Sequence, residues 1–245
     1  MKINVLTLFP EMFTAVKSSI LGRAEEKGIL DIDLVNIRDF SKNKHKKVDD
    51  YPFGGGVGML MQAEPIFGAL RSVEAQNKKI VYMSPKGAVL NQDKIEELSK
   101  EENLVVLCGH YEGIDQRVLD SWDIEEVSIG DYILTGGEPA AIVLIDAVAR
   151  MIPGVLGDFD SVHEESIYSG LLEHPQYTKP RNFEGMEVPE VLLSGHHKNI
   201  HLWQYEQALK ITKEKRPDLF ENYCKSDHQL TKEEKKILEK ISNIV

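Results

Sequence analysis

Four carboxylates and one arginine occur close together in the middle of the sequence, where their side chains could carry out acid–base chemistry. They are Glu112, Asp115, Asp131, Glu138 and Arg150. A carboxylate can take up a proton during a reaction, and a fixed guanidinium can stabilise a negative charge that develops on an oxygen. Most acidic residues are solvated surface groups, and an arginine is favoured at a helix C-terminus. Position alone therefore leaves a purely structural role open for each residue.

Two glycine-containing bends lie among these charged residues and indicate a ligand pocket. Gly130 belongs to the first bend, and Gly136 and Gly137 belong to the second. Because glycine has no Cβ, the backbone there can approach a ligand closely. An apolar strand over residues 127–129 leads into the bends, and a helix with proline in its first turn follows over residues 138–152. The sequence therefore predicts a small-molecule pocket at these bends.

The glycine run at residues 54–58 is a second feature that could contact a ligand. A phosphate-binding Walker loop would continue with Gly-Lys-Ser or Gly-Lys-Thr, whereas here Met59 and Leu60 follow. No strand leads directly into the run, as a dinucleotide-binding fingerprint requires, so a flexible turn remains an alternative. Five basic residues precede the run and could contact a polyanion or form only a solvated loop: Arg38, Lys42, Lys44, Lys46 and Lys47.

The composition points to a soluble protein of a reducing compartment. Among 245 residues, 42% are hydrophobic and 28% charged, and the net charge of −11 argues against general coating of nucleic acid or membrane. Cys108 and Cys224 form no CxxC pair, and His197 and His201 lack the glutamate of a zinc motif. The apolar runs are too short for a signal peptide or a bilayer span. We therefore expect a cytoplasmic protein without a metal motif or a membrane partner.

Strands and helices alternate over the first two thirds of the chain. A helical stretch starts at Pro10, and Gly22 and Gly28 are predicted to break it and then end it. Alternation of this kind predicts an α/β fold with a mainly parallel sheet, whose ligands bind beyond the carboxyl ends of the strands. Loops at residues 84–87, 109–113 and 130–137 follow such ends. The predicted strands cover residues 3–9, 30–34, 79–83, 104–108 and 126–129, and the predicted helices cover residues 62–76, 92–100 and 138–152.

The character of the sequence changes after residue 157. Residues 158–166 are polar and acidic, as in an interdomain linker, and residues 167–245 are helical in pattern and more basic. Pro217 is predicted to end one helix, and Thr231 with Glu234 forms a capping box for the last one. We therefore expect a first domain at 1–157, a linker at 158–166 and a small helical domain at 167–245.

Eight motifs along the chain resemble those of the bacterial tRNA (guanine-N1)-methyltransferases, which belong to the SPOUT class. The resemblance spans almost the whole chain in the same order, and the fourth and fifth motifs below are its most specific part. The motifs are LFPEMF, VDDYPFGGGVGMLM, YMSPKG, CGHYEGIDQRV, SIGDYILTGGE, DAVARMIPGVLG, GLLEHPQYTKP and VPEVLLSGHH.

This resemblance implies a fold and a reaction that the patterns above do not supply. The fold would be α/β with a deep trefoil knot that binds S-adenosylmethionine, followed by a helical tRNA-binding domain. The methyl group would pass to N1 of guanosine 37 in tRNA, just 3′ of the anticodon. The residues implied to bind the donor are Tyr82, Met83, Ser84, Pro85, Gly109, Tyr111, Glu112, Ser128, Ile129, Gly130, Asp131, Tyr132, Ile133, Leu134, Gly136 and Gly137.

The same resemblance assigns catalytic roles to three residues. Guanine N1 carries a proton at neutral pH, so a base and a nearby cation are required. Glu165 stands where the family has an aspartate base, one methylene longer, and Arg150 matches the arginine that stabilises O6. Glu112 matches a residue that the family associates with substrate or magnesium. His110 stands where many members have arginine.

The resemblance also implies the partners. Arg23, Asp49, Gly54 and Gly58 match residues that contact tRNA or its target base. The family enzyme is a homodimer in which the knot of one subunit faces the linker and C-terminal domain of the other. Two alternatives remain: a non-catalytic RNA-binding protein that retains the donor pocket, and a phosphate-loop nucleotide hydrolase, against which the absent Gly-Lys-Ser/Thr argues.

Overall fold

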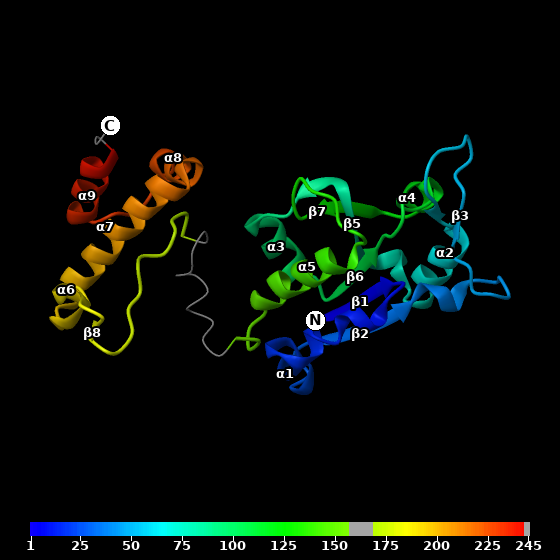
Figure 1. The fold of residues 1–245 in the computed structure, drawn as a ribbon, viewed down its shortest axis with the longest axis horizontal. Helices are drawn as coiled ribbons and strands as arrows, with labels where there is room; N and C mark the ends of the chain where they lie inside the picture. The colour runs from blue at the N-terminus through cyan, green and yellow to red at the C-terminus, as the bar shows by residue number, and fades with distance from the viewer. Residues whose placement is uncertain (157–168, 243–245) are drawn as a thin grey trace. The chain divides into compact units, whose positions relative to one another are not determined.

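A five-stranded sheet in which every neighbouring pair is parallel forms the centre of the first part of the chain, in the order β2-β1-β6-β5-β7 (Figure 1). The computed structural model describes residues 1–156 and 169–242, and the chain divides into two compact units, 1–159 and 160–245. The predicted α/β fold with a mainly parallel sheet is thereby confirmed. The strands are β1 (Lys2–Thr7), β2 (Asp31–Asn36), β5 (Lys79–Val89), β6 (Asn103–Cys108) and β7 (Ile124–Ser128).

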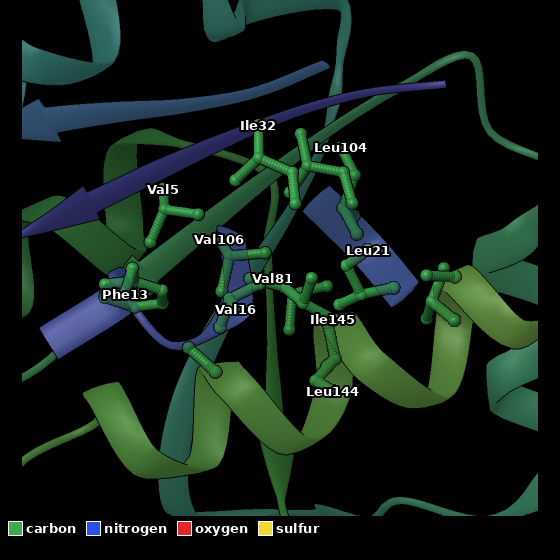
Figure 2. Packing of buried hydrophobic residues seen from close by; sticks show 14 of the residues in the cluster. Val5, Phe13, Val16, Leu21, Ile32, Val81, Leu104, Val106, Leu144 and Ile145 are labelled. Atoms are coloured by element: carbon green, nitrogen blue, oxygen red, sulfur yellow. The ribbon is translucent and has the colours of Figure 1, made fainter. Parts of the chain in front are cut away.

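Both faces of this sheet are covered by helices. Along β6, Leu104 and Val106 face one apolar cluster and Val105 and Leu107 face the other, as the alternation of side chains in a strand requires. In the first cluster, Leu144 and Ile145 of α5 (Glu138–Arg150) pack beneath the strands (Figure 2). Also on this face are α1 (Ile20–Glu26) and α3 (Gln92–Ser99), and on the other are α2 (Ala63–Ser72) and α4 (Gln116–Ser121).

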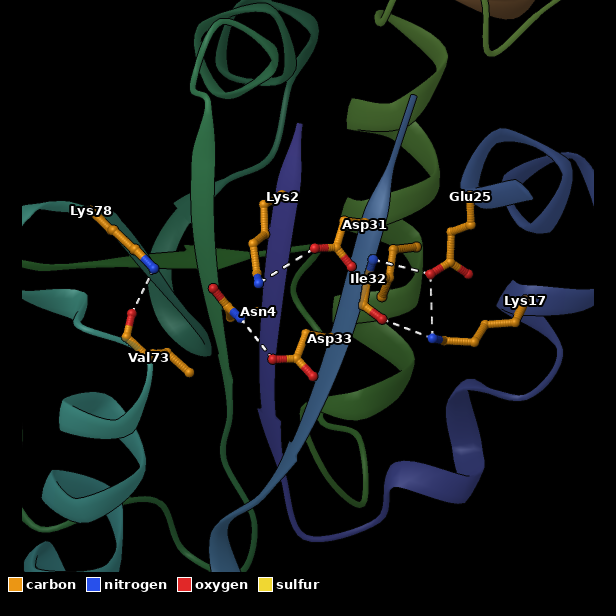
Figure 3. A network of polar contacts seen from close by, with 9 residues as sticks. All are labelled: Lys2, Asn4, Lys17, Glu25, Asp31, Ile32, Asp33, Val73 and Lys78. Atoms are coloured by element: carbon orange, nitrogen blue, oxygen red, sulfur yellow. Dashed lines mark hydrogen bonds and ion pairs between the residues drawn. The ribbon is translucent and has the colours of Figure 1, made fainter. Parts of the chain in front are cut away.

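The open edge of the sheet at β2 is protected by side chains rather than by another strand. At Ile32, the backbone N–H donates to Glu25 Oε1 (3.1 Å) and the carbonyl accepts from Lys17 Nζ (2.8 Å), and these two side chains also pair with each other (Figure 3). Unpaired backbone groups on an edge strand invite pairing with another chain. The Lys17–Glu25 pair removes that possibility at the start of β2, where Ile32 lies.

The predicted loop at residues 84–87 is part of a longer strand. Met83 and Ala88 both pair with Val127 of β7, so the residues between them bulge from the sheet and β5 then resumes pairing. Pro85 lacks an N–H and is tolerated in such a bulge. A Cβ on Gly87 would lie 2.2 Å from the carbonyl carbon of Glu126, so the two backbones pass in contact. The predicted strand end at residue 83 was therefore wrong, because β7 continues to offer hydrogen bonds.

Three helix predictions also need correction. Gly22 does not break the first helical stretch, because it lies inside α1, where a Cβ would meet the Lys17 carbonyl oxygen at 2.0 Å. Gly28, with φ +70°, does follow the end of that helix as predicted. Helix α2 ends at Ser72 and α5 at Arg150, both earlier than predicted, and α4 was missed. The remaining short elements are η1 (Pro10–Phe13), η2 (Val16–Ser18), η3 (Ile37–Phe40), β3 (Asp49–Asp50), β4 (Leu60–Met61) and η4 (Ala75–Asn77).

The second unit has its own small apolar core. Leu209, Phe220 and Ile241 meet there from three helices. The capping box is confirmed, since Thr231 N–H donates to Glu234 Oε2 (2.7 Å) and Glu234 N–H donates to Thr231 Oγ1 (3.3 Å). The elements are β8 (Asn182–Phe183), β9 (Met186–Glu187), α6 (Glu190–Leu193), α7 (His197–Lys215), α8 (Pro217–Lys225) and α9 (Lys232–Ser242). Within residues 1–156 and 169–242, no helix combines the length and apolar character that crossing a bilayer demands.

Candidate functional site

A pocket of about 430 Å³ opens where β5, β6 and β7 end at the same edge of the sheet. This volume is in the range of small-molecule sites. The first wall comes from the β5 bulge, the second from residues 109–114 and the third from residues 126–137, and α4 closes one side. The lining residues are Leu60, Tyr82, Met83, Ser84, Pro85, Lys86, Gly109, His110, Tyr111, Glu112, Gly113, Ile114, Gln116, Leu119, Glu126, Val127, Ser128, Ile129, Gly130, Tyr132, Ile133, Leu134, Thr135, Gly136, Gly137 and Ala140.

The pocket brings together all the residues expected to bind a donor except Asp131. Asp131 lies on the bend but does not line the pocket. The sequence reasoning missed Lys86, Gln116 and Glu126, among others. Lys86 adjoins predicted residues in the same bulge, whereas the sequence did not distinguish Glu126 from its neighbour Glu125. Gln116 belongs to the unpredicted helix α4, so no local signal pointed to it.

Glycine is required in the second and third walls because the two backbones touch. The Gly137 N–H donates to the Gly109 carbonyl (2.7 Å), and a Cβ on Gly137 would come 2.9 Å from the Gly109 nitrogen. A Cβ on Gly109 would in turn meet the Tyr82 hydroxyl at 2.6 Å. Larger residues would therefore separate the walls or fill the pocket between them.

The start of α5 is held in place by a buried carboxylate. Glu138 is only 1% exposed and accepts a hydrogen bond from Thr7 Oγ1 (2.8 Å) at the end of β1. The Thr7 hydroxyl oxygen accepts in turn from the Phe9 N–H (2.9 Å). A carboxylate at a helix N-terminus also faces the positive end of the helix dipole. Glu138, one of the candidate acids, therefore has a structural function beside the third wall.

The glycine run at residues 54–58 forms the tip of a hairpin beside the pocket. Its strands β3 and β4 pair, and the Glu112 N–H donates to the Met59 carbonyl (3.0 Å). A Cβ on Gly58 would lie 2.4 Å from Glu112 Cγ, and Tyr111 Oη donates to Asp49 Oδ1 at 3.5 Å. Asp49 and Gly58 thus lie against pocket residues. Gly54 lies further out, with φ +88° and open space around it.

The three other expected site residues are not part of this pocket. Arg150 lies ten residues beyond Ala140 on α5, about 15 Å along the helix axis at 1.5 Å per residue. Arg23 is exposed on α1, away from the pocket lining. Glu165 lies outside the described residues. The pocket of a single chain therefore contains Glu112 but not Arg150.

The basic segment before the hairpin is largely paired with acidic residues. Lys42 lies 2.6 Å from Glu64, Lys46 lies 2.6 Å from Asp39, and Lys47 lies 3.4 Å from Asp50. These pairs are exposed, and exposed pairs contribute little stability and exchange readily with other partners. The lysines could therefore turn toward an external polyanion at small cost.

The polar and apolar groups of the pocket suit an organic ligand better than a metal ion. Among residues 1–156 and 169–242, no group of three or more histidine, cysteine, aspartate or glutamate side chains is arranged to hold a metal. By contrast, the glycine walls leave backbone groups accessible, and Glu126 Oε2 is buried there without a hydrogen-bond partner in the described chain. An adenosine-containing molecule, with apolar faces and several hydrogen-bond donors, fits these features.

Comparison with known proteins gives a consistent family. The model of the family "tRNA (Guanine-1)-methyltransferase TrmD" matches residues 1–222. A tRNA (guanine-N(1)-)-methyltransferase of Clostridium perfringens (strain 13) is 56% identical over 239 residues, which are 97% of this chain and 99% of the relative. The proteins of the same name from Clostridium beijerinckii and Clostridium tetani are 55% and 54% identical, over 99% and 97% of this chain and 100% and 97% of their own.

Proposed function

Because the chain belongs to the tRNA (guanine-1)-methyltransferase family, we propose that it transfers a methyl group from S-adenosylmethionine to N1 of guanosine 37 in tRNA. The observation that best supports this proposal is the pocket, because residues of the family motifs form its three walls. When bound, the donor supplies an electrophilic methyl group. The walls hold it through the residues expected from the sequence, chiefly by backbone groups that the glycines leave open.

The proton at guanine N1 is the chemical difficulty of this reaction. Methylation requires that N1 loses its proton while negative charge develops toward O6. We assign the uptake of the proton to Glu165 and the stabilisation of O6 to Arg150. We assign the orientation of the substrate to Glu112, which lines the pocket and lies against Gly58. Magnesium is usually bound through one or two carboxylates and several waters, and Glu112 is a pocket carboxylate that would contribute to such a site.

A site shared between the two subunits of a homodimer would explain how Arg150 can act at a pocket that it does not reach within its own chain. Within one chain, Arg150 lies about 15 Å along α5 from the pocket lining, too far for its side chain to reach a base there. A second subunit would bring its own Arg150 and Glu165 to the pocket. This distance supports the dimer proposal without using any contact between chains.

The pocket walls are proposed to form a deep trefoil knot. The close backbone approach of the second and third walls, Gly137 against Gly109, supports this. We further propose that the helical domain at residues 167–245 binds tRNA, and that the enzyme acts in the cytoplasm, where tRNA is found.

Transfer of a labelled methyl group tests the function directly. Purified protein, S-adenosylmethionine and unmodified tRNA should yield 1-methylguanosine at position 37, detected by nuclease digestion and mass spectrometry. A tRNA with another base at this position is the control and should remain unmethylated. If the protein binds donor and tRNA but transfers no methyl group, the non-catalytic RNA-binding alternative would replace our proposal.

Binding of tRNA is expected to weaken strongly with salt. With about three or four phosphate contacts, raising the salt concentration from 50 to 200 mM should lower affinity by roughly 40- to 150-fold, because counterions are released on binding. Filter binding over this range measures the slope. Lys44→Ala should reduce the slope by about 1, since Lys44 is exposed and has no ion pair in the described chain, whereas Lys100→Ala, just after α3, should leave it unchanged. A salt-independent affinity would contradict the proposed basic contact.

A further inference from the structure

Glu126 has a different environment from its neighbour in sequence, Glu125. Side chains of adjacent strand residues point to opposite faces of a sheet. On one face of β7, Glu125 pairs with Lys79 (2.8 Å) and Lys94 (2.7 Å). On the other face, Glu126 lines the pocket, and its Oε2 is buried without a hydrogen-bond partner among the described residues. A buried, unpaired carboxylate oxygen is costly, so a partner from outside the protein is implied.

The Tyr82 side chain lies on the same face as Glu126, because the two residues are paired across β5 and β7, and it also lines the pocket. It is 6% exposed, and its hydroxyl packs against the backbones of Gly109 and Gly113. Burial, together with the negative charge of Glu126, raises the pKa of Tyr82 to about 12. The hydroxyl therefore keeps its proton at neutral pH and can donate it, yet no hydrogen bond from it occurs within the described chain. This part of the pocket thus presents one acceptor and one donor, both without partners.

The chemistry of the donor molecule narrows what can occupy this place. An ammonium group only donates hydrogen bonds and would leave the Tyr82 proton unpaired. Two vicinal hydroxyls can donate one bond and accept another, and a carboxylate is a common acceptor for ribose hydroxyls. The edge of adenine could also do both. However, the apolar side chains that could enclose a flat base, Ile129, Ile133 and Leu134, come after the end of β7, whereas Glu126 lies within that strand.

We infer that Glu126 and Tyr82 bind the ribose diol of the methyl donor, with Glu126 accepting a hydrogen bond from one hydroxyl and Tyr82 donating one to the other. This inference rests on the proposed function and adds two side-chain contacts to a site otherwise built from backbone. Tyr82 was expected at the donor site, whereas the role of Glu126 and the group that both recognise are new.

Calorimetry with S-adenosylhomocysteine, the stable product, and its 2′-deoxy and 3′-deoxy analogues tests the assignment without any turnover. For the unchanged protein, removing the bonded hydroxyl should weaken binding by about 10- to 100-fold, as expected for a hydrogen bond to a charged group. Glu126→Gln should weaken binding of the parent ligand by a similar factor. Removal of the same hydroxyl should then cost this variant only about 2- to 10-fold, because the neutral amide oxygen of glutamine accepts a weaker hydrogen bond than a carboxylate does.

Two further variants separate recognition from folding. Glu125→Gln is the matched control on the opposite face, and it should keep both the parent affinity and the full deoxy penalty. Tyr82→Phe should show the same loss of penalty toward the second hydroxyl. Thermal unfolding of each variant shows whether it is folded. If Glu126→Gln is unstable, the affinities of Tyr82→Phe for the parent ligand and for the deoxy analogue still test the inference.

The inference is overturned if Glu126→Gln binds the parent ligand as tightly as the unchanged protein, or if the full deoxy penalty persists in it. The inference is also overturned if Glu126→Gln abolishes the loss of affinity caused by removing the adenine amino group and not the loss caused by removing a ribose hydroxyl. Failure of the proposed function is a separate result: the unchanged protein would then neither bind S-adenosylhomocysteine nor methylate tRNA. Binding and methylation by the unchanged protein without any coupling would reject only the ribose assignment.

Discussion

Replacing Glu165 with glutamine is expected to slow methyl transfer by about 10²- to 10⁴-fold, the range typical for loss of a general base, while donor affinity stays unchanged. Glutamine preserves the shape of the side chain but cannot take the proton from guanine N1. Single-turnover kinetics with saturating donor and tRNA measure this effect without interference from product release. Calorimetry with the donor checks that the pocket is intact.

Two control variants test whether the effect depends on the carboxylate at position 165. Glu164→Gln removes the preceding carboxylate and should leave the rate within about twofold, as expected for a substitution away from the reaction. Glu165→Asp restores the family's usual residue and should retain most of the activity, because the base is kept. If Glu165→Gln transfers methyl at the normal rate, another group accepts the proton and our assignment is wrong.

Replacing Arg150 with glutamine is expected to lower kcat by about 10²- to 10³-fold, comparable to removal of one donor to a developing oxyanion. The guanidinium would stabilise the charge at O6 only in the transition state, so the KM for tRNA should change much less. Arg150→Lys keeps the charge and should recover part of the rate. Arg71→Gln is the matched control, since Arg71 also stands in the last turn of a helix. Equal activity of Arg150→Gln and the unchanged protein would exclude this role.

Mixed dimers can show in which pocket Arg150 acts. A Gly109→Val subunit has a blocked pocket, because its side chain would meet the Tyr82 hydroxyl. Combined with a Glu165→Gln subunit, it should regain activity, since one intact pocket then meets one intact glutamate from the other chain. Combining Arg150→Gln with Glu165→Gln should give no recovery if both residues of one chain serve the same partner pocket. Recovery in the second mixture, or none in the first, would contradict the shared site.

Much of the fold could be predicted from local patterns. Short apolar runs marked the parallel strands, because a strand buried on both faces needs apolar residues throughout. Residue types also identified helix ends: Thr231 and Glu234 cap the start of the last helix through two hydrogen bonds, and Gly28 takes the positive φ that follows α1. The residues of the three walls were predicted as neighbours because parallel strands end at one edge of a sheet.

The errors arose where contacts distant in sequence outweighed local preference. Pairing with β7 carries β5 past the Pro85 bulge, and close packing against Lys17, not helix breaking, explains Gly22. The ends of α2 and α5 differ from the prediction by a few residues, and helix ends, which fray, are the least sharply defined part of a helix.

The sequence by itself therefore determined the elements, the glycine-lined bends and, through its motifs, the family, because these depend on residue type and spacing along the chain. Only the tertiary structure decided which side chains share a pocket. It placed Glu126 beside Tyr82 with an unpartnered oxygen, and it placed Arg150 at the far end of α5 from the pocket. The reason is physical, because burial and distance depend on how strands and helices pack in three dimensions. Glu125 and Glu126 are the same residue type at adjacent positions, and only the sheet directs their side chains to opposite faces.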